Sequence, residues 1–380
     1  MNSSLSDKIT HRTAKVGIIG LGYVGLPLAL GFAKAGFFTI GLEISPEKVD
    51  ALNAARSYIE DVADAEVAPH VQTGRLRATT DYDVLRECDA IFICVPTPYT
   101  IQRAPDLSYI ISATEDIALR LQPGQLVVLQ STTYPGTTTE VVQPILEGAS
   151  GLNAAVDDFY LAFSPERIDP GNQQWSAYNT PKVVGGLTPD ATGVAAALLR
   201  QMGARVHEVS SPAAAELTKL LENTFRSVNI ALVNEMALLS ERMGIDFWEV
   251  VEAAKTKPFG FMPFTPGPGV GGHCIPIDPY YLLWKAREYD FYTRFIELAA
   301  ETNEAMPYHV VDLVVEGLSA LGKSLRGTRV LVLGVAFKPN IGDPRNSPAE
   351  RVIELLLRRG ADVCCLLYTS DAADEEDSVD

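Results

Sequence analysis

Residues 16–43, VGIIGLGYVGLPLALGFAKAGFFTIGLE, decide the fold. The short apolar run at 16–19 ends in glycine and predicts a buried strand. The apolar pattern over about residues 24–35 predicts a helix. A second apolar run, Phe38–Leu42, predicts the next strand. A strand, a helix and a strand in immediate succession are typical of a parallel βαβ unit.

Three glycines follow the first strand and lead into the start of the helix, and each has a use in binding a dinucleotide. Gly20 permits a tight turn, Gly22 lets the backbone approach a pyrophosphate, and Gly25 allows the helix to pack closely on the strand. The helix N-terminus itself attracts an anion. The residues between the glycines, Tyr23 and Val24, belong to the same candidate site. A glycine-rich turn that binds no ligand is the alternative.

Glu43 indicates which dinucleotide the site would take. It ends the second strand, where a carboxylate would bind the ribose 2′-hydroxyl and repel a 2′-phosphate. NAD is therefore favoured over NADP, although the nearby Lys48 softens that discrimination.

The alternation of strand and helix continues along the chain. Ala90–Val95 and Leu126–Leu129 are continuous apolar runs, as expected of strands that are buried on both faces. Leu161–Phe163 and Val183–Val184 predict later strands. The predicted fold class is therefore α/β, with an N-terminal Rossmann-type sheet, mostly parallel and doubly wound, over residues 14–207.

The middle of the chain is predicted to be helical. Residues 211–242, 247–255 and 279–306 have helical patterns, and a loop rich in Gly and Pro, 257–276, lies between the last two. We therefore predict a helical central domain over residues 208–312. A loop of that length in a compact domain is usually functional.

The last part of the chain predicts a third, incomplete domain. Thr328–Leu333 and Ala361–Leu367 predict strands around a helix at Ser347–Arg359, which gives a partial C-terminal Rossmann-like domain over residues 320–367. Because a single βαβ start cannot bury both faces of its sheet, we expect this domain to stop early. The acidic residues 368–380 predict a disordered tail.

The composition limits the class of protein. The chain has 380 residues, 47% of them hydrophobic, and a formal net charge of −17, which disfavours nucleic acid and anionic membranes as partners. Its apolar runs fall short of the roughly 20 residues that span a bilayer, and its polar N-terminus is unlike a secretory signal. Five cysteines without a CxxC pair indicate neither zinc nor a disulfide scaffold. We expect a cytoplasmic protein with reduced thiols and no metal.

Cys274 is the candidate nucleophile. It follows the glycine-dense segment PGPGVGGH and precedes an apparent helix start; a helix N-terminus lowers a thiol pKa, and the thiolate is the reactive form. Asp278 follows four residues later, and Gly271 would let a substrate approach the backbone. The alternative is a small buried hydrophobic residue, which is the structural role that we expect of Cys88, Cys94, Cys364 and Cys365. His273 is expected to make a hydrogen bond within the loop.

Polar residues follow the predicted strands of the sheet. The carboxyl ends of the strands form the edge where doubly wound sheets bind ligands. We therefore expect a ligand near Val95, Thr97, Ser131 and Thr132, although turns and helix caps use the same residue types.

Glu166 and Arg167 follow the strand at 161–163 in the segment SPER. A carboxylate at a strand end suits a general base. A surface capping residue is the competing interpretation.

Lys219 and Asn223 are four residues apart on the first predicted helix of the middle region, so they share one face. A Lys ammonium group and a side-chain amide on one face of a helix could bind and stabilise a developing oxyanion. Spacing alone favours the ordinary alternative, a solvated face with Glu216 and Glu222 nearby.

Together these segments resemble the UDP-glucose/GDP-mannose dehydrogenase family. The matching pieces cover roughly residues 14–350 in family order: GLGYVGLPLA, CVPTP, QSTTYPGTT, SPERIDPGN, ELTKLLENTFRSVNIALVNE, PGPGVGGHCIPIDPYYL and GVAFKPNIGDPRNSP. The resemblance implies an N-terminal NAD-binding domain, a central domain that forms a homodimer, and a C-terminal domain that binds a UDP-sugar.

The resemblance also implies a four-electron oxidation of a C6 alcohol to the uronic acid with two NAD, through a thiohemiacetal and a thioester on Cys274. Lys219 would stabilise oxyanions, Asp278 would assist proton transfer, and Asn223 and Thr132 would position groups or water. Glu166 would serve the hydrolysis. The implied cofactor contacts include Val95, Thr97, Ser131 and Arg345, and the implied substrate contacts include Glu166, Arg167, Lys219, Asn223, Gly271 and Lys338.

Three segments resemble the N-acetylhexosamine branch of the family in their exact sequence: SPERIDPGN, KPFGFMPFTPGPGVGGHCIPIDPYYLLWKAREY and RFIELA. UDP-N-acetylglucosamine is therefore favoured over UDP-N-acetylmannosamine and UDP-glucose, with a role in making polysaccharide precursors. The terminal CCLLYTSDAADEEDSVD does not resemble the family, so an inactive, truncated NAD-binding chain stays open. A two-electron dehydrogenase of the hydroxyacid or 6-phosphogluconate type, which needs no nucleophilic cysteine, is the other alternative.

Overall fold

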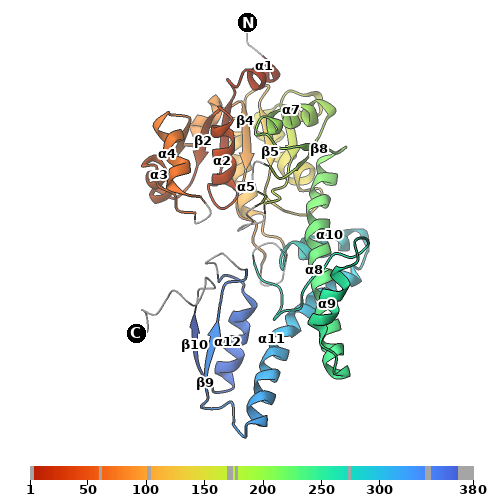
Figure 1. The fold of residues 1–380 in the computed structure, drawn as a ribbon. Helices are drawn as coiled ribbons and strands as arrows, with labels where there is room; N and C mark the ends of the chain where they lie inside the picture. The colour runs from red at the N-terminus through yellow and green to blue at the C-terminus, as the bar shows by residue number, and fades with distance from the viewer. Residues whose placement is uncertain are drawn as a thin grey trace. The chain divides into compact units, whose positions relative to one another are not determined.

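The computed structural model describes residues 4–59, 62–100, 104–168, 174–175, 179–272, 275–338 and 344–366. The chain divides into two compact units, Met1–Leu220 and Leu221–Asp380, and each is described by itself. Figure 1 shows a central sheet covered by helices in the first unit, and helices with a small sheet in the second.

Within the described residues, the first unit holds an eight-stranded sheet in the order β3-β2-β1-β4-β5-β6-β7-β8. Neighbouring strands are parallel except for β6 and β7, which are antiparallel. The predicted mostly parallel, doubly wound sheet is therefore confirmed. The strands are β1 (Lys15–Ile19), β2 (Phe38–Leu42), β3 (Leu76–Thr79), β4 (Ala90–Ile93), β5 (Leu126–Leu129), β6 (Tyr160–Phe163), β7 (Lys182–Gly186) and β8 (Val206–Glu208).

Both faces of this sheet are buried, because alternate residues of each central strand enter different cores. In β4, Ala90 and Phe92 pack with α2 on one face, while Ile91 and Ile93 pack with α5 on the other. This double burial explains why the central strands are apolar runs without polar alternation. The helices of the first unit are α1 (Leu5–Thr10), α2 (Gly25–Lys34), α3 (Pro46–Asn53), α4 (Asp64–Gln72), η1 (Tyr82–Glu87), α5 (Ser108–Ala118), η2 (Thr138–Val142), α6 (Gln143–Ser150), η3 (Ala154–Val156) and α7 (Pro189–Arg200).

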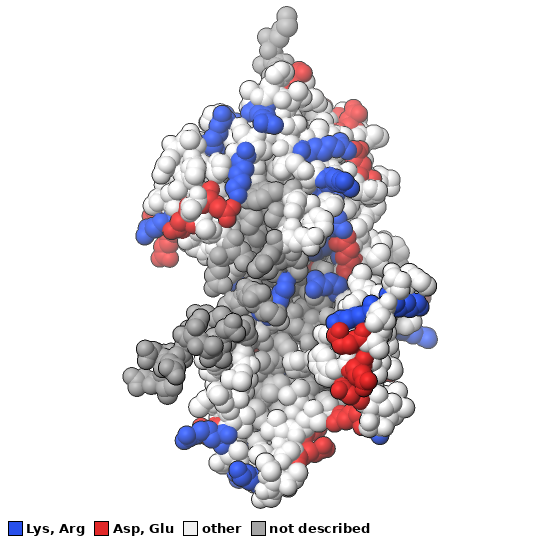
Figure 2. All heavy atoms as spheres, in the orientation of Figure 1, with Lys and Arg blue, Asp and Glu red and all other residues white. Residues whose placement is uncertain are grey.

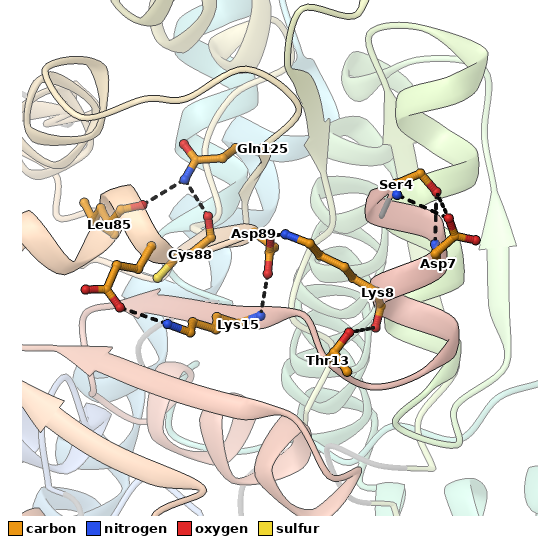
Figure 3. A network of polar contacts seen from close by, with 10 residues as sticks. Ser4, Asp7, Lys8, Thr13, Lys15, Leu85, Cys88, Asp89 and Gln125 are labelled. Atoms are coloured by element: carbon orange, nitrogen blue, oxygen red, sulfur yellow. Dashed lines mark hydrogen bonds and ion pairs between the residues drawn. The ribbon is translucent and has the colours of Figure 1, made fainter. Parts of the chain in front are cut away.

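Hydrogen bonds connect the segments at the edge of the sheet where β1 and β4 begin (Figure 3). Asp89 accepts a hydrogen bond from Lys8 Nζ at 2.5 Å and another from the backbone N–H of Lys15 at 2.8 Å. Gln125, next to the start of β5, donates from Nε2 to the carbonyl oxygens of residues 85 and 88. These contacts set the strand starts, and they leave the opposite edge of the sheet for the candidate site.

Helices make up most of the second unit. α8 (Pro212–Met243) crosses from the first unit into the second and is followed by α9 (Phe247–Lys255), α10 (Asp278–Ala286), η4 (Arg287–Tyr289) and α11 (Arg294–Ala320). One helix over residues 279–306 was the prediction, and it is wrong. The chain breaks between η4 and α11, where Asp290 adopts a left-handed φ of 52° that a helix cannot continue through.

A short βαβ segment ends the described part of the second unit. β9 (Arg329–Leu333) and β10 (Asp362–Leu366) pair in parallel, with α12 (Pro348–Arg358) between them. Ser347 caps α12 by accepting from the N–H of Ala349, and Leu355 and Leu356 of α12 pack with Val311 of α11. The predicted strand, helix and strand are confirmed, while the predicted tail at 368–380 lies outside the described residues.

None of the helices in the described ranges is both long enough and apolar enough to cross a bilayer. On the face drawn in Figure 2, Lys and Arg side chains lie among Asp and Glu side chains of the first unit rather than in one basic field.

Candidate active site

The order of the strands places one end of β1 and β4 at the centre of the candidate site. β1 is flanked by β2 on one side and by β4 on the other, so the two halves of the sheet diverge here. Ligands of doubly wound sheets bind outside the carboxyl ends of the strands at such a point. Gly20 follows β1 with a φ of 86°, and a Cβ there would lie 2.7 Å from the carbonyl oxygen of Cys94. Only glycine fits this turn.

The other two glycines of the motif differ in the space around them. A Cβ on Gly25 would lie 1.8 Å from the carbonyl oxygen of Gly20, whereas no described atom lies within 4 Å of a Cβ on Gly22. Val24 is the N-cap of α2, and none of the described side chains caps this terminus. The open side of Gly22 and the uncapped N-terminus fit the pyrophosphate of a dinucleotide, with the exposed Tyr23 beside them.

Glu43 lies at the end of β2 beside this turn. Its carboxylate is buried and accepts hydrogen bonds from the backbone N–H groups of Leu21 at 3.2 Å and Ser45 at 3.3 Å. Lys48 Nζ lies 3.8 Å from Glu43 Oε2. Tyr58 donates to the carbonyl oxygen of Leu21 at 2.9 Å, and burial, followed by the charge of Glu43, raises the Tyr58 pKa. The carboxylate is therefore held where the sequence predicts a ribose contact.

A side-chain hydrogen bond joins the ends of β4 and β5. Ser131 Oγ donates to the carbonyl oxygen of Val95 at 2.8 Å. Thr97 and Thr132 are partly buried in the same two segments. The structure thus brings together predicted cofactor residues that follow β1, β4 and β5.

Glu166 is a buried carboxylate, not the surface capping residue that was the competing interpretation. Both of its oxygens lie 2.9 Å from Lys182 Nζ, and the side chain of Lys182 is itself 1% exposed. Gln130 Nε2 donates to Glu166 at 2.9 Å, and the backbone N–H groups of Arg167 and Ile168 donate at 2.8 and 3.0 Å. The structure therefore assigns Glu166 to a buried ion pair.

The sequence prediction missed Lys182. This residue starts β7, and because β7 is antiparallel to β6, its start lies at the end of β6 that carries Glu166. A parallel β7 would have placed Lys182 at the opposite edge. Arg167 contributes to the same arrangement, since its guanidinium donates to the carbonyl oxygen of Pro181 at 2.7 Å.

Much of α8 has the reverse of the usual amphipathic pattern, because polar side chains are buried and large apolar side chains are exposed. Its polar residues at helical spacing are buried, so the interpretation of Lys219 and Asn223 as part of a solvated face is wrong. The buried polar side chains are Glu216, Lys219, Asn223, Ser227, Asn234 and Ser240, and the exposed apolar ones are Leu217, Leu221, Phe225, Leu232, Met236, Leu239 and Met243.

Glu216 shows how this buried face is used in the first unit. Its carboxylate accepts from the N–H of Gly136 at 2.6 Å and from the N–H and hydroxyl of Thr138 at 2.9 and 2.6 Å. Burial raises the Glu216 pKa, and these hydrogen bonds oppose the rise. Glu216 therefore binds the start of η2 and has a structural role.

In the second unit, two predicted site residues meet. Asn223 Nδ2 of α8 donates to Asp278 Oδ2 at 2.5 Å, and both side chains are buried. Asp278 is the first residue of α10, which confirms the predicted helix start after the cysteine. Cys274 and His273 lie outside the described residues.

The glycine-rich segment before Cys274 is packed against distant parts of the second unit. A Cβ on Gly271 would lie 2.6 Å from Phe337 Cβ, and one on Gly272 would lie 2.9 Å from the ring of Phe337. Lys338 follows Phe337 and is partly buried, while Arg345 is exposed. The loop after β9 therefore lies against the loop that carries the candidate nucleophile.

A chain of buried amides, which the sequence prediction missed, holds the same loop on its other side. Asn234 accepts from the N–H of Gly267 at 2.9 Å and donates to Asn303 Oδ1 at 2.9 Å, and Asn303 donates to the carbonyl oxygen of Ser227 at 3.1 Å. Ser227 and Asn303 also line a cavity of about 660 Å³ that borders Gly269. The sequence holds one indication of this arrangement. Ser227 and Asn234 are seven residues apart, which places both on one face of the helix.

The described cysteines have different surroundings. Burial raises the pKa of the Cys88 thiol to about 12 and also raises that of Cys94. Their expected structural role is consistent with this burial, because thiolate formation is disfavoured there. Cys364 and Cys365 are exposed in β10.

Family models match three successive parts of the chain. Residues 14–203 match the NAD binding domain of the UDP-glucose/GDP-mannose dehydrogenase family, residues 213–305 its central domain, and residues 331–375 its UDP binding domain. The chain belongs to the UDP-glucose/GDP-mannose dehydrogenase family. It is an NAD-dependent oxidoreductase, which confirms the predicted family, enzyme class and cofactor.

Relatives of known name cover most of the chain. The chain is 38% identical over 343 residues to UDP-N-acetyl-D-glucosamine 6-dehydrogenase of Pseudomonas aeruginosa. This alignment covers 90% of this chain and 80% of that protein. The solved structure of UDP-D-ManNAc dehydrogenase from Pyrococcus horikoshii has a TM-score of 0.87 at 36% identity, covering 92% of this chain and 82% of that one. A UDP-glucose dehydrogenase from the archaeon Pyrobaculum islandicum has a TM-score of 0.85 at 31% identity, covering 93% and 81%.

Proposed function

We propose that this chain oxidises the C6 alcohol of a UDP-N-acetylhexosamine to the uronic acid in two successive NAD-dependent steps, through a covalent intermediate on Cys274. The observation that carries the proposal is the buried hydrogen bond between Asn223 and Asp278. It joins two polar side chains from distant parts of the sequence at the helix start that follows the cysteine segment.

The first unit supplies the groups that would hold NAD. Gly22 and the N-terminus of α2 would receive the pyrophosphate, and Glu43 would accept a hydrogen bond from the adenosine ribose. Val95, Thr97 and Ser131 would contact the rest of the cofactor. The family resemblance adds Arg345 as a cofactor contact, within one copy or toward the cofactor of a neighbouring copy. Bound NAD supplies the acceptor for a hydride.

The need for a nucleophile follows from the chemistry of a four-electron oxidation. The aldehyde formed first must be retained, and a thiol retains it as a thiohemiacetal whose oxidation gives a thioester. Lys219 would stabilise the oxyanions that develop, and Asp278 would transfer protons. Asn223 holds Asp278 in place, and Thr132 would position substrate or water. Glu166 would serve the final hydrolysis.

UDP-N-acetylglucosamine is the favoured substrate. Lys338, Arg167 and the backbone at Gly271 would contribute to its binding together with the residues above. The chain is 38% and 36% identical to dehydrogenases that are named for the two N-acetylhexosamine epimers, and these identities are too similar to choose between the two substrates. Our preference therefore follows the segments that resemble the N-acetylhexosamine branch. UDP-N-acetylmannosamine and UDP-glucose are the competing substrates.

The test is NADH formation by the purified full chain with the three UDP-sugars in parallel. We expect two NADH per UDP-N-acetylglucosamine and a uronic acid product, with turnover abolished in Cys274→Ser. Cys88→Ser is the matched control, and it should keep its turnover because Cys88 is buried in the core. One NADH per sugar, or turnover that survives Cys274→Ser, would contradict the covalent mechanism. NAD binding without turnover of any of these sugars would contradict the function.

We also propose that two copies of the chain associate through the apolar face of α8. Leu221, Leu232 and Leu239 are exposed on one face of this helix, since spacings of 11 and 7 residues return to the same side. Sedimentation of the full chain should give a dimer, and Leu232→Glu should give a monomer. The control Glu241→Gln, nine residues after Leu232 and therefore on the opposite side of the helix, should stay dimeric, and a monomeric parent chain would contradict the proposal.

A further inference from the structure

We propose that Tyr58 is a positioning residue for the cofactor: its hydroxyl fixes the peptide group between Leu21 and Gly22, so that the N–H of Gly22 is presented to the pyrophosphate of NAD. The proposal rests on the cofactor site proposed above and concerns the first unit alone. Tyr58 itself lies outside the glycine motif, in the segment between α3 and α4.

Side chains hold two neighbouring peptide groups of the glycine turn. The N–H of Leu21 donates to Glu43 Oε2 at 3.2 Å, and the carbonyl oxygen of Leu21 accepts from the Tyr58 hydroxyl at 2.9 Å. The N–H belongs to the peptide group that follows Gly20, and the carbonyl oxygen belongs to the peptide group that precedes Gly22. Glu43 and Tyr58 therefore orient two successive peptide groups.

The peptide group before Gly22 is trans, because no cis peptide bond occurs in the described ranges. In a trans peptide the C=O and the N–H point in opposite directions. The hydrogen bond from Tyr58 to the carbonyl oxygen of Leu21 therefore directs the N–H of Gly22 away from Tyr58. None of the described groups accepts a hydrogen bond from this N–H, and no described atom lies within 4 Å of a Cβ on Gly22. An N–H donor beside open space at a helix start suits a phosphate oxygen.

Gly22 is the residue of the turn that most needs such a restraint. Glycine accepts a wide range of backbone angles because it has no Cβ, and this one has no close neighbour that would limit its rotation. A hydrogen bond to the preceding carbonyl oxygen removes part of this freedom before the cofactor binds. Preorganisation of this kind improves affinity because less entropy is lost on binding.

The Tyr58 side chain is itself held as a hydrogen-bond donor. It packs against the core of the first unit, and Lys48 Nζ lies 5.6 Å from the centre of its ring. Burial, followed by the charge of Glu43, raises the Tyr58 pKa, so the hydroxyl keeps its proton at neutral pH. Lys48 Nζ also lies 3.8 Å from Glu43 Oε2. Tyr58 is thereby linked to the end of β2 as well as to the turn after β1.

The test compares a ligand that has a pyrophosphate with one that has none. Tyr58→Phe removes the hydroxyl and keeps the ring. We expect its dissociation constant for ADP-ribose, measured by titration calorimetry on the full chain, to rise about tenfold, because a hydrogen bond to a charged group is misplaced. The dissociation constant for adenosine, measured by ligand-observed NMR, should change by less than about twofold, because adenosine has the ribose and no phosphate.

Tyr160→Phe is the matched control. Tyr160 is partly buried at the start of β6, and because β6 is parallel to β5, this start lies at the edge of the sheet opposite to the cofactor site. Both dissociation constants should stay unchanged in this variant. Tyr58→Phe should fold like the control, since one lost hydrogen bond is small beside the stability of a domain, and circular dichroism at the titration temperature checks this.

The outcomes separate the role of Tyr58 from the cofactor site itself. An equal loss of ADP-ribose and adenosine affinity in Tyr58→Phe would mean a general structural role and would overturn the proposal. Unchanged ADP-ribose affinity in Tyr58→Phe, beside a loss in Gly22→Ala, would also overturn it and would leave the cofactor site in place. Unchanged affinity in both variants would place the pyrophosphate elsewhere. A parent chain that binds neither ADP-ribose nor NAD would overturn the proposed function as well.

Discussion

The chain has two glycine-rich segments that use the same residue for different purposes. In residues 20–25, two glycines are tightly packed and Gly22 between them faces open space. In residues 267–272, Gly269, Gly271 and Gly272 would all bring a Cβ within 3.0 Å of another part of the unit. The first segment leaves room for a ligand beside a helix N-terminus. The second is shaped by contacts with α11 and with the loop after β9.

The largest effect on stability is expected from Gly25→Ala. Its Cβ would lie 1.8 Å from the carbonyl oxygen of Gly20, a backbone atom that cannot move without opening the turn. We expect the free energy of unfolding to fall by about 3 kcal/mol or more, measured by urea denaturation. Gly193→Ala in α7 is the control, because no described atom lies within 4 Å of its Cβ. Equal stability of the two variants would show that the turn is not tightly packed.

The next largest effect on stability is expected from the buried amides that contact the second glycine-rich segment. Asn234→Ala removes the acceptor of the Gly267 N–H and the donor to Asn303, leaving buried groups unpaired. The expected loss in the free energy of unfolding is about 2–3 kcal/mol. Asn229→Ala on the same helix removes one exposed hydrogen bond and should cost less than about 1 kcal/mol. If both variants lose the same amount, the amide chain does not hold the loop.

A smaller effect is expected where the second segment contacts Phe337. Gly272→Ala should cost about 2 kcal/mol, because its Cβ would meet the ring at 2.9 Å and its φ of 93° disfavours a side chain. In a Phe337→Ala background the ring contact is absent, and only the backbone cost of about 1 kcal/mol should remain. A double-mutant cycle by thermal unfolding measures this coupling. Additive costs would place the ring away from the loop.

Gly22→Ala should have the smallest effect on stability and a separate effect on binding. No described atom lies near its Cβ, so the free energy of unfolding should change by less than about 0.5 kcal/mol. NAD affinity should fall at least tenfold, or about 1.4 kcal/mol, because the methyl group occupies the approach of the pyrophosphate. Titration calorimetry on the folded variant measures this, and unchanged affinity would place the cofactor elsewhere.

Local patterns predicted the first segment well, since the strand, the glycine turn, the helix and Glu43 lie within 28 consecutive residues. The apolar runs of β4 and β5 and the helix that begins near Ser347 were predicted for the same reason. Lys182 and the Asn234–Asn303 contact could not be predicted in this way. The first depends on one antiparallel strand, and the second joins residues 69 apart in the sequence. The break before α11 was missed because helical periodicity continues on both sides of it.

The inverted pattern of α8 has a consequence for how the chain would respond to dilution. The large apolar side chains that α8 leaves exposed contribute little to stability when the chain folds as a single copy, because they are not removed from water. In the proposed dimer, each copy supplies the apolar surface that the other lacks, so stability becomes a matter of mass action. A tenfold change in protein concentration would then change the free energy of unfolding by about 1.4 kcal/mol per dimer. The unfolding midpoint should rise with concentration, and the candidate site, built partly on the buried side of the same helix, should lose its activity as the protein is diluted.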